Sequence, residues 1–118
     1  MNREDFFAIA TSGEVNEANV AELTAIYGTQ IPDIIKRIVS HNINALFLNE
    51  VRIMSLEEIK EAEHDLHVDF VKKGFLPIAD CGDNDFIIYH LQEKIWSKYN
   101  IVDDVVFKRR ESLEELIK

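Results

Sequence analysis

Cysteine, glycine and proline are all scarce in this chain, which has one cysteine, four glycines and two prolines among its 118 residues. A single cysteine excludes an internal disulfide and is typical of proteins from a reducing compartment. The Walker lysine loop and the GxGxxG, GxSxG and CxxC patterns are absent. No apolar run approaches the roughly 18 residues that span a bilayer, and the N-terminus carries acids where a signal peptide carries positive charge. We therefore expect a cytoplasmic protein without membrane contact.

Basic residues are also few. The chain has 13 lysines and arginines against 22 aspartates and glutamates, which gives a net charge of −9. Such a surface repels phosphate backbones, and the one compact basic cluster, residues 108–110, is too small to reverse that repulsion. We therefore expect no nucleic-acid partner. An acidic surface permits steered association with a basic protein, and it also simply keeps a small protein soluble.

The apolar content of 47% indicates one globular domain covering residues 1–118, without repeats or linkers. Helical patterns occupy the first third of the chain. Residues 17–27 are predicted to form a helix with Asn16 as its N-cap and Gly28 just after its end. A second helix is expected to start with Pro32 at its first position, and a shorter helix is expected around Phe6.

Strand patterns begin near residue 45. Residues 45–48 and 51–54 are short and apolar, and Ser55-Leu-Glu-Glu58 is a capping box that opens a helix predicted to continue to Leu66. Four further strand-like segments, residues 75–78, 86–91, 95–99 and 105–107, predict an antiparallel meander. Pro77 cannot donate a ladder hydrogen bond, so its strand should lie at a sheet edge or begin there.

A second capping box, Ser112-Leu-Glu-Glu115, predicts a closing helix over residues 113–118. Helices followed by a run of strands and a final helix favour an α+β fold, with a central, mostly antiparallel sheet flanked by helices.

The stretch from Pro77 to Leu91 carries three aspartates and the only cysteine. If Asp83 were position one of an EF-hand loop, the sixth residue should be glycine and the twelfth glutamate, but Ile88 and Lys94 occupy them. A hairpin turn, with Gly82 supplying unusual backbone angles, is the stronger interpretation. An irregular calcium site formed by Asp80, Asp83 and Asp85 stays an alternative.

Catalytic and zinc-binding patterns are weak elsewhere. Cys81 has no activating neighbourhood, because the surrounding carboxylates raise a thiol pKa and His90 lies across a turn. His64 and His67 are three residues apart but lack the further ligands of a zinc site. We therefore expect no enzyme activity, no metal and no cofactor. A small metal-dependent enzyme that uses the three aspartates and His90 is the remaining alternative of that class.

The order of several motifs resembles the SUKH superfamily, which includes a fungal regulator of cell-wall synthesis and many bacterial toxin-immunity proteins. The motifs are Ile26-Tyr-Gly-Thr-Gln-Ile-Pro-Asp33, Val51-Arg-Ile-Met-Ser-Leu-Glu-Glu-Ile59, Leu76-Pro-Ile-Ala-Asp-Cys-Gly-Asp-Asn-Asp-Phe86 and Glu111-Ser-Leu-Glu-Glu-Leu-Ile117. The resemblance implies an α+β domain with no catalytic residues. It also implies a surface that subfamilies vary to bind different toxins.

The leading hypothesis is therefore an immunity protein that binds and neutralises a cognate bacterial toxin, such as a basic nuclease. A non-catalytic regulatory or protein-interaction module of the same fold is the alternative. If a partner surface exists, its candidate residues are the carboxylates at the meander turns, together with one aromatic residue: Asp80, Asp83, Asp85, Asp103, Asp104 and Trp96. An edge strand near Pro77 would leave self-association open.

Overall fold

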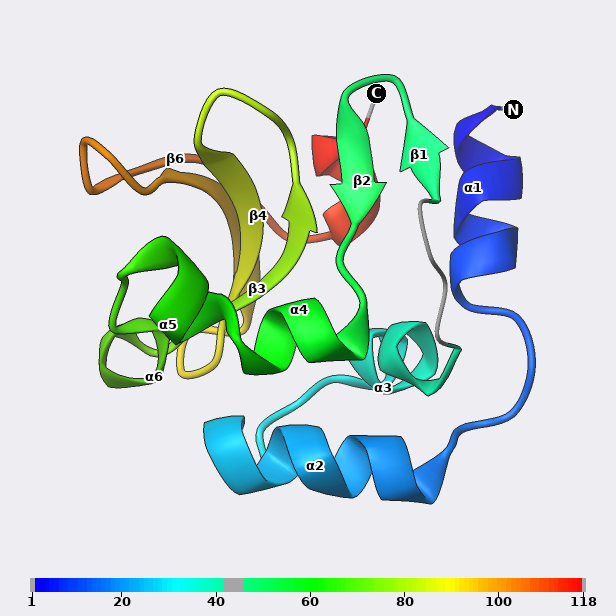
Figure 1. The fold of residues 1–118 in the computed structure, drawn as a ribbon. Helices are drawn as coiled ribbons and strands as arrows, with labels where there is room; N and C mark the ends of the chain where they lie inside the picture. Colours follow the sequence, from blue (N-terminus) through cyan, green and yellow to red (C-terminus); the bar gives the residue numbers. More distant parts are fainter. Residues whose placement is uncertain (1, 42–45, 118) are drawn as a thin grey trace.

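A computed structural model describes residues 2–41 and 46–117 of the chain. Within these residues, helices precede and interrupt a six-stranded antiparallel sheet (Figure 1). The predicted α+β class is confirmed. The elements follow in the order α1 (Arg3–Ala10), α2 (Glu17–Tyr27), α3 (Asp33–Ser40), β1 (Phe47–Leu48), β2 (Val51–Ile53), α4 (Leu56–Lys60), α5 (Ala62–Leu66), α6 (Phe70–Lys73), β3 (Phe75–Asp80), β4 (Asp85–His90), β5 (Ile95–Asn100), β6 (Val105–Arg110) and the 3₁₀ helix η1 (Leu113–Leu116).

The sheet is the predicted meander, because its strands lie side by side in sequence order from β1 to β6. The prediction that the strand of Pro77 lies at a sheet edge or begins at this residue is wrong, since β3 begins at Phe75 and lies between β2 and β4. Pro77 is tolerated because the register shifts between Pro77 and Ala79, and proline without an amide hydrogen fits at such a bulge. On its other side β3 is paired with β2 only at Ala79 and Asp80.

The first three helices match their sequence signals. The side chain of Asn16 accepts a hydrogen bond from the Asn19 amide, 3.1 Å away, which caps α2 as predicted. Gly28 ends α2 with a φ of 87°, a value that glycine adopts without strain. Pro32 stands one position earlier than expected, because it is the N-cap of α3 and Asp33 is the first helical residue.

The helix predicted from Ser55 to Leu66 is divided into α4 and α5 at Glu61. Its capping box is present: Ser55 Oγ accepts from the Glu58 amide at 3.2 Å, and the Glu58 carboxylate accepts from the Ser55 amide at 3.1 Å. The sequence near Glu61 contains no proline or glycine, so tertiary packing decides the break. The short helix α6 was not predicted.

The closing helix is a 3₁₀ turn rather than an α-helix, and Lys118 lies outside the described residues. A helix of four residues gives too few α-type hydrogen bonds to repay nucleation, so the tighter i to i+3 pattern forms. The start of the first predicted strand, residue 45, also lies outside the described residues.

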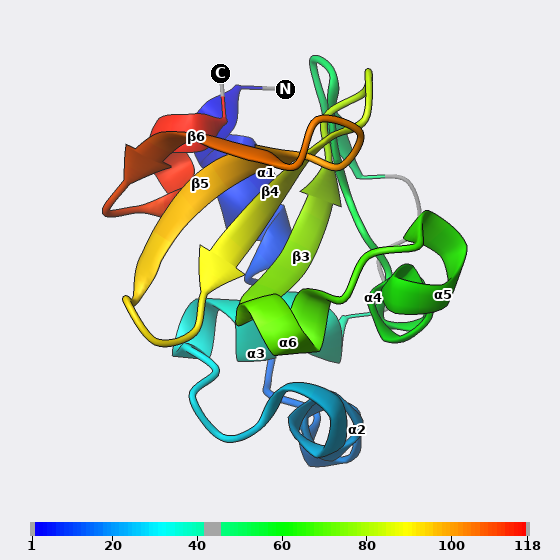
Figure 2. The same ribbon diagram turned by 90° about the vertical axis from the view of Figure 1, so that its left-hand side faces the viewer.

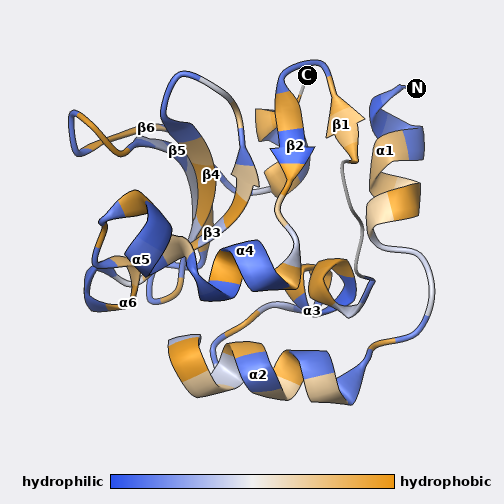
Figure 3. Cartoon of the chain, viewed as in Figure 1, coloured by the Kyte–Doolittle hydropathy of each residue, from blue (hydrophilic) through white to orange (hydrophobic). Residues whose placement is uncertain are grey.

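Figures 1 and 2 show α1 and η1 on one side of the sheet, with α2 and α3 across its lower end. In Figure 3 the apolar residues of α1, α3 and the strands face the interior between these layers. The largest fully buried side chains include Phe6, Ile35, Ile59 and Ile87. None of the helices in the described part of the chain has the length and apolar character that crossing a bilayer requires.

The two sheet edges differ. Strand β1 has only two residues and lies next to α1. Strand β6 has six residues and contains the basic cluster, and its register shifts opposite Trp96 and Lys98, where Lys108 has a φ of 53°.

Candidate functional site

Three hairpin turns emerge at one end of the sheet, because alternate connections of a meander lie at the same end. These are residues 49–50, 81–84 and 101–104, and the registers Arg52↔Asp80 and Asp85↔Asn100 align them. Figures 1 and 2 show the β1–β2 and β3–β4 turns at the same end of the molecule. We call the carboxylates in these turns and at the adjoining strand ends the acidic end: Glu50, Asp80, Asp83, Asp85, Asp103 and Asp104.

The β3–β4 turn has the hairpin structure predicted for it. Gly82, Asp83 and Asn84 all have positive φ values, of 81°, 52° and 65°. The carboxylate of Asp80 accepts a hydrogen bond from the Gly82 amide at 2.9 Å, which is the local backbone bonding expected of aspartate in a turn. Asp80 therefore helps to shape the turn.

Asn100 joins this turn to the next. Its side-chain nitrogen Nδ2 donates to Asp85 Oδ1 at 2.9 Å, and its side-chain oxygen Oδ1 accepts from the Val102 and Asp103 amides at 3.1 and 2.9 Å. The Ile101 amide donates to the Asn84 carbonyl at 3.0 Å. The two acidic turns therefore form one hydrogen-bonded surface.

Part of the charge at the acidic end is already paired. Asp104 accepts hydrogen bonds from the Tyr99 hydroxyl and from Lys73, and these contacts hold the pKa of its carboxyl below the ordinary value. Asp80 lies 3.7 Å from Arg52, which also makes two 2.7 Å hydrogen bonds to Glu58.

Other carboxylates at the acidic end are unpaired. Within the described part of the chain, the carboxylates of Glu50, Asp83 and Asp103 make no hydrogen bond or ion pair, and all three residues are exposed. These three side chains carry the charge that the acidic end can offer to another molecule.

Trp96 does not share this surface. Its side chain is 5% exposed and packs against Tyr89, with ring centroids 4.8 Å apart. Little of the indole is left for a partner to contact, and its main role is to fill the core beside β4.

Cys81 and His90 are not brought together by the hairpin. Cys81 is 7% exposed, and burial raises the pKa of its thiol to about 11, with Asp80 and Asp85 as smaller contributors. His90 stands at the far end of β4, about 17 Å from Asp85 at the rise of an extended strand. The metal-enzyme alternative needs His90 in one site with the three aspartates, and the length of β4 holds His90 apart from Asp85.

His90 instead forms a buried pair that the sequence did not suggest. Its Nε2 lies 2.7 Å from Ser97 Oγ, and its Nδ1 lies 4.0 Å from Glu93 Oε1. The order resembles a serine–histidine–carboxylate nucleophilic site, but Ser97 is 0% exposed and no substrate can reach its hydroxyl. Only the register Ile88↔Ser97, which places His90 near Ser97 across the strands, reveals the pair.

The described residues contain no group of three or more His, Cys, Asp or Glu side chains placed to hold a metal ion. His64 contacts the neighbouring Asp65 at 3.2 Å, and His67 ends α5 with a φ of 56°.

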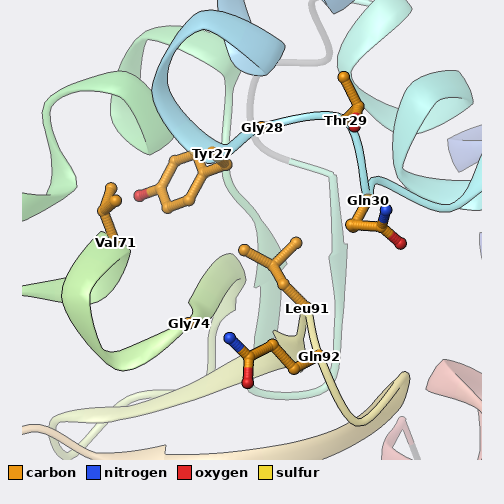
Figure 4. Close-up of a pocket in the computed structure, with 8 residues that line it drawn as sticks. All are labelled: Tyr27, Gly28, Thr29, Gln30, Val71, Gly74, Leu91 and Gln92. Atoms are coloured by element: carbon orange, nitrogen blue, oxygen red, sulfur yellow. The ribbon is translucent and has the colours of Figure 1, made fainter.

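A pocket of about 440 Å³ lies at the other end of the sheet, and sequence reasoning missed it. We call it the helical-end pocket (Figure 4). Its lining comes from the end of α2 and the loop after it, from α6 and its end, and from the β4–β5 turn: Tyr27, Gly28, Thr29, Gln30, Val71, Gly74, Leu91 and Gln92. Because these segments are far apart in sequence, no motif could have shown them as one site.

Comparison with known proteins does not assign the chain to a family: no family model matches it, and neither the curated proteins nor the solved structures gave a significant match.

Proposed function

We propose that this protein is a cytoplasmic immunity protein that binds a basic bacterial toxin through its acidic end and thereby blocks the toxin. The observation that carries the proposal is the alignment of the acidic turns at one end of the sheet, with Glu50, Asp83 and Asp103 left unpaired. The resemblance of the motif order to the SUKH superfamily supports the same function.

The unpaired carboxylates of the acidic end suit a mode of inhibition in which this protein covers a basic cleft of the toxin. Unpaired surface carboxylates speed the encounter with a positively charged partner and fix its orientation, especially at low salt. The turns are held by Asn100 and by local backbone bonds, so the carboxylates are presented on a rigid support and little order is lost on binding.

The experiment begins with coexpression. Toxin domains encoded beside the gene are expressed with and without this protein, and cell survival and complex formation on gel filtration are measured. We expect rescue by one cognate toxin and a stable complex with it. Failure to rescue from every neighbouring toxin domain, together with no complex, would reject the proposal, and a partner that is caught without any toxicity would favour a regulatory module.

Charge reversal then tests the surface. The variant Asp83→Lys/Asp103→Lys should slow association with the toxin by about tenfold or more at low salt and weaken its salt dependence. The matched control Glu14→Lys/Glu111→Lys changes two exposed carboxylates outside the acidic turns and takes the net charge from −9 to −5 equally, since each replacement adds two charges. Equal slowing in both variants would show that net charge, and not the acidic end, steers binding.

A further inference from the structure

The helical-end pocket lies apart from the acidic end. Leu91 and Gly74 stand at the opposite ends of β4 and β3 from the acidic turn, and their backbones are joined by a 2.9 Å hydrogen bond from the Leu91 amide to the Gly74 carbonyl. Six residues of extended strand separate the two regions, which is about 20 Å. A ligand in the pocket would therefore not touch the acidic turns.

None of the eight residues that line the pocket is charged. The floor and one wall are apolar, formed by Leu91, Val71 and the ring of Tyr27, while Gln30, Gln92 and Thr29 supply amides and a hydroxyl. A volume of about 440 Å³ is within the range of small-ligand sites. An apolar surface with a few neutral polar groups selects an uncharged ligand, since a charged one would lose hydration without an ion pair.

Tyr27 supplies an independent observation that points to ligand binding. Its side chain is 6% exposed, and its hydroxyl is buried without a hydrogen-bond partner among residues 2–41 and 46–117. Figure 4 shows the ring extending along the wall of the pocket toward Val71. A buried unpaired hydroxyl costs free energy, so such groups are normally completed by water or by a ligand. Burial, with Glu63 as a smaller contributor, raises the pKa of Tyr27, so the hydroxyl keeps its proton and can donate.

The loop that follows Tyr27 is also open to hydrogen bonding. Neither Thr29 nor Gln30 makes a backbone or side-chain hydrogen bond within the described part of the chain. Gly28, with φ 87° and ψ −170°, and Pro32, with φ −72° and ψ 158°, show that this loop leaves α2 in a non-helical conformation. It therefore presents both donors and acceptors along one side of the pocket.

We propose that the helical-end pocket binds a short, uncharged segment of polypeptide. A peptide group offers one donor and one acceptor, which matches the unpaired backbone of the loop and the two glutamine amides. A small apolar side chain of the segment would contact Val71 and Leu91. A sugar is a poorer match, because Tyr27 is almost completely buried and leaves little ring face for stacking.

The test uses N-acetyl-leucinamide, an uncharged probe with two amide groups and one apolar side chain, in an NMR titration of the backbone amides. We expect saturable shifts at Gly28, Gly74 and Gln92, with a Kd of about 1–10 mM for a probe of this size. N-acetyl-leucine, which carries a carboxylate, should bind more weakly. The absence of saturable shifts, or shifts confined to other regions, would overturn the proposal, and binding of methyl β-glucoside in place of the amide probe would overturn the ligand class.

The variant Tyr27→Phe separates a binding role from a structural one, with Tyr89→Phe as the matched control in β4. We expect Tyr27→Phe to weaken probe binding about tenfold, the worth of one hydrogen bond, without lowering the melting temperature of the free protein. Tyr89→Phe should leave probe affinity unchanged. If Tyr27→Phe lowers the melting temperature and leaves probe affinity intact, the hydroxyl bonds to Glu63 within the protein and the proposal is wrong.

Discussion

The two ends of the sheet are built in different ways. The acidic end consists of hairpin turns, each formed by residues that are neighbours in sequence, and its hydrogen bonds link those turns to one another. The helical-end pocket is assembled from α2, α6 and the β4–β5 turn, and it keeps polar groups that have no partner within the described chain. In our two proposals, the acidic end binds its partner through unpaired carboxylates, whereas the helical-end pocket binds through neutral hydrogen-bonding groups.

The largest effect on the free energy of unfolding is expected from a core residue that lies between the two ends of the sheet. Ile88 is fully buried in the middle of β4, between Pro77 and Ser97 on the neighbouring strands. Ile88→Ala should lower the free energy of unfolding by about 2–5 kcal/mol, because it removes buried methyl groups and leaves a cavity. Urea unfolding followed by signals from both ends should show a single transition. Two separate transitions would show that the ends unfold independently.

A smaller and more discriminating effect is expected from the same chemical change at each end. Tyr99→Phe removes the hydrogen bond to Asp104 at the acidic end and should cost about 1 kcal/mol of unfolding free energy. Tyr27→Phe removes a hydroxyl that has no partner and should leave stability unchanged or raise it. Urea unfolding of the two variants measures the difference, and equal losses would contradict the proposed contrast.

The dependence of stability on pH gives a third test, which concerns His90 near the pocket end of β4. Burial, reinforced by Arg109 and opposed by Glu93, lowers the pKa of His90 from its ordinary value of 6.5. The unfolded chain therefore binds the proton first, so the stabilising contribution is complete above pH 6.5 and is lost as the pH falls from 6.5 toward the folded-state pKa. The loss from one such group is at most about 1.4 kcal/mol per pH unit.

His90→Gln should flatten this slope, while His64→Gln, the same change at a side chain that is 85% exposed, should retain it. The free energy of unfolding between pH 5 and 7.5 is the measurement. If the slope of unfolding free energy against pH is unchanged in both variants, His90 does not cause the pH dependence of stability in this range.

Local signals predicted most of the elements. Asn16 caps α2, Ser55 and Glu58 form their box, and the four strands of the meander lie where their apolar patterns indicate. These features depend on residues a few positions apart, which a sequence displays directly. The turn around Gly82 is likewise predicted by neighbouring residues, since Gly82 and Asp80 shape it locally.

The errors came from partners that are distant in sequence. Pro77 lies in an inner strand because β2, which precedes three helices, pairs with the other end of β3. The break at Glu61 and the burial of Trp96 depend on what packs against them. The sequence predicts Tyr27 as the last residue of a helix, and only the approach of α6 and the β4–β5 turn makes it part of a pocket.

The meander also has a consequence for folding kinetics. The pairings β3–β4, β4–β5 and β5–β6 each cross a short turn, so these hairpins can form on the microsecond scale without long loop closure. The pairing of β2 with β3 must close the segment 54–74, which contains α4, α5 and α6. The contact between Arg52 and Asp80 therefore bears the largest loop-closure entropy in the sheet, and this junction is where the last step of sheet assembly is expected.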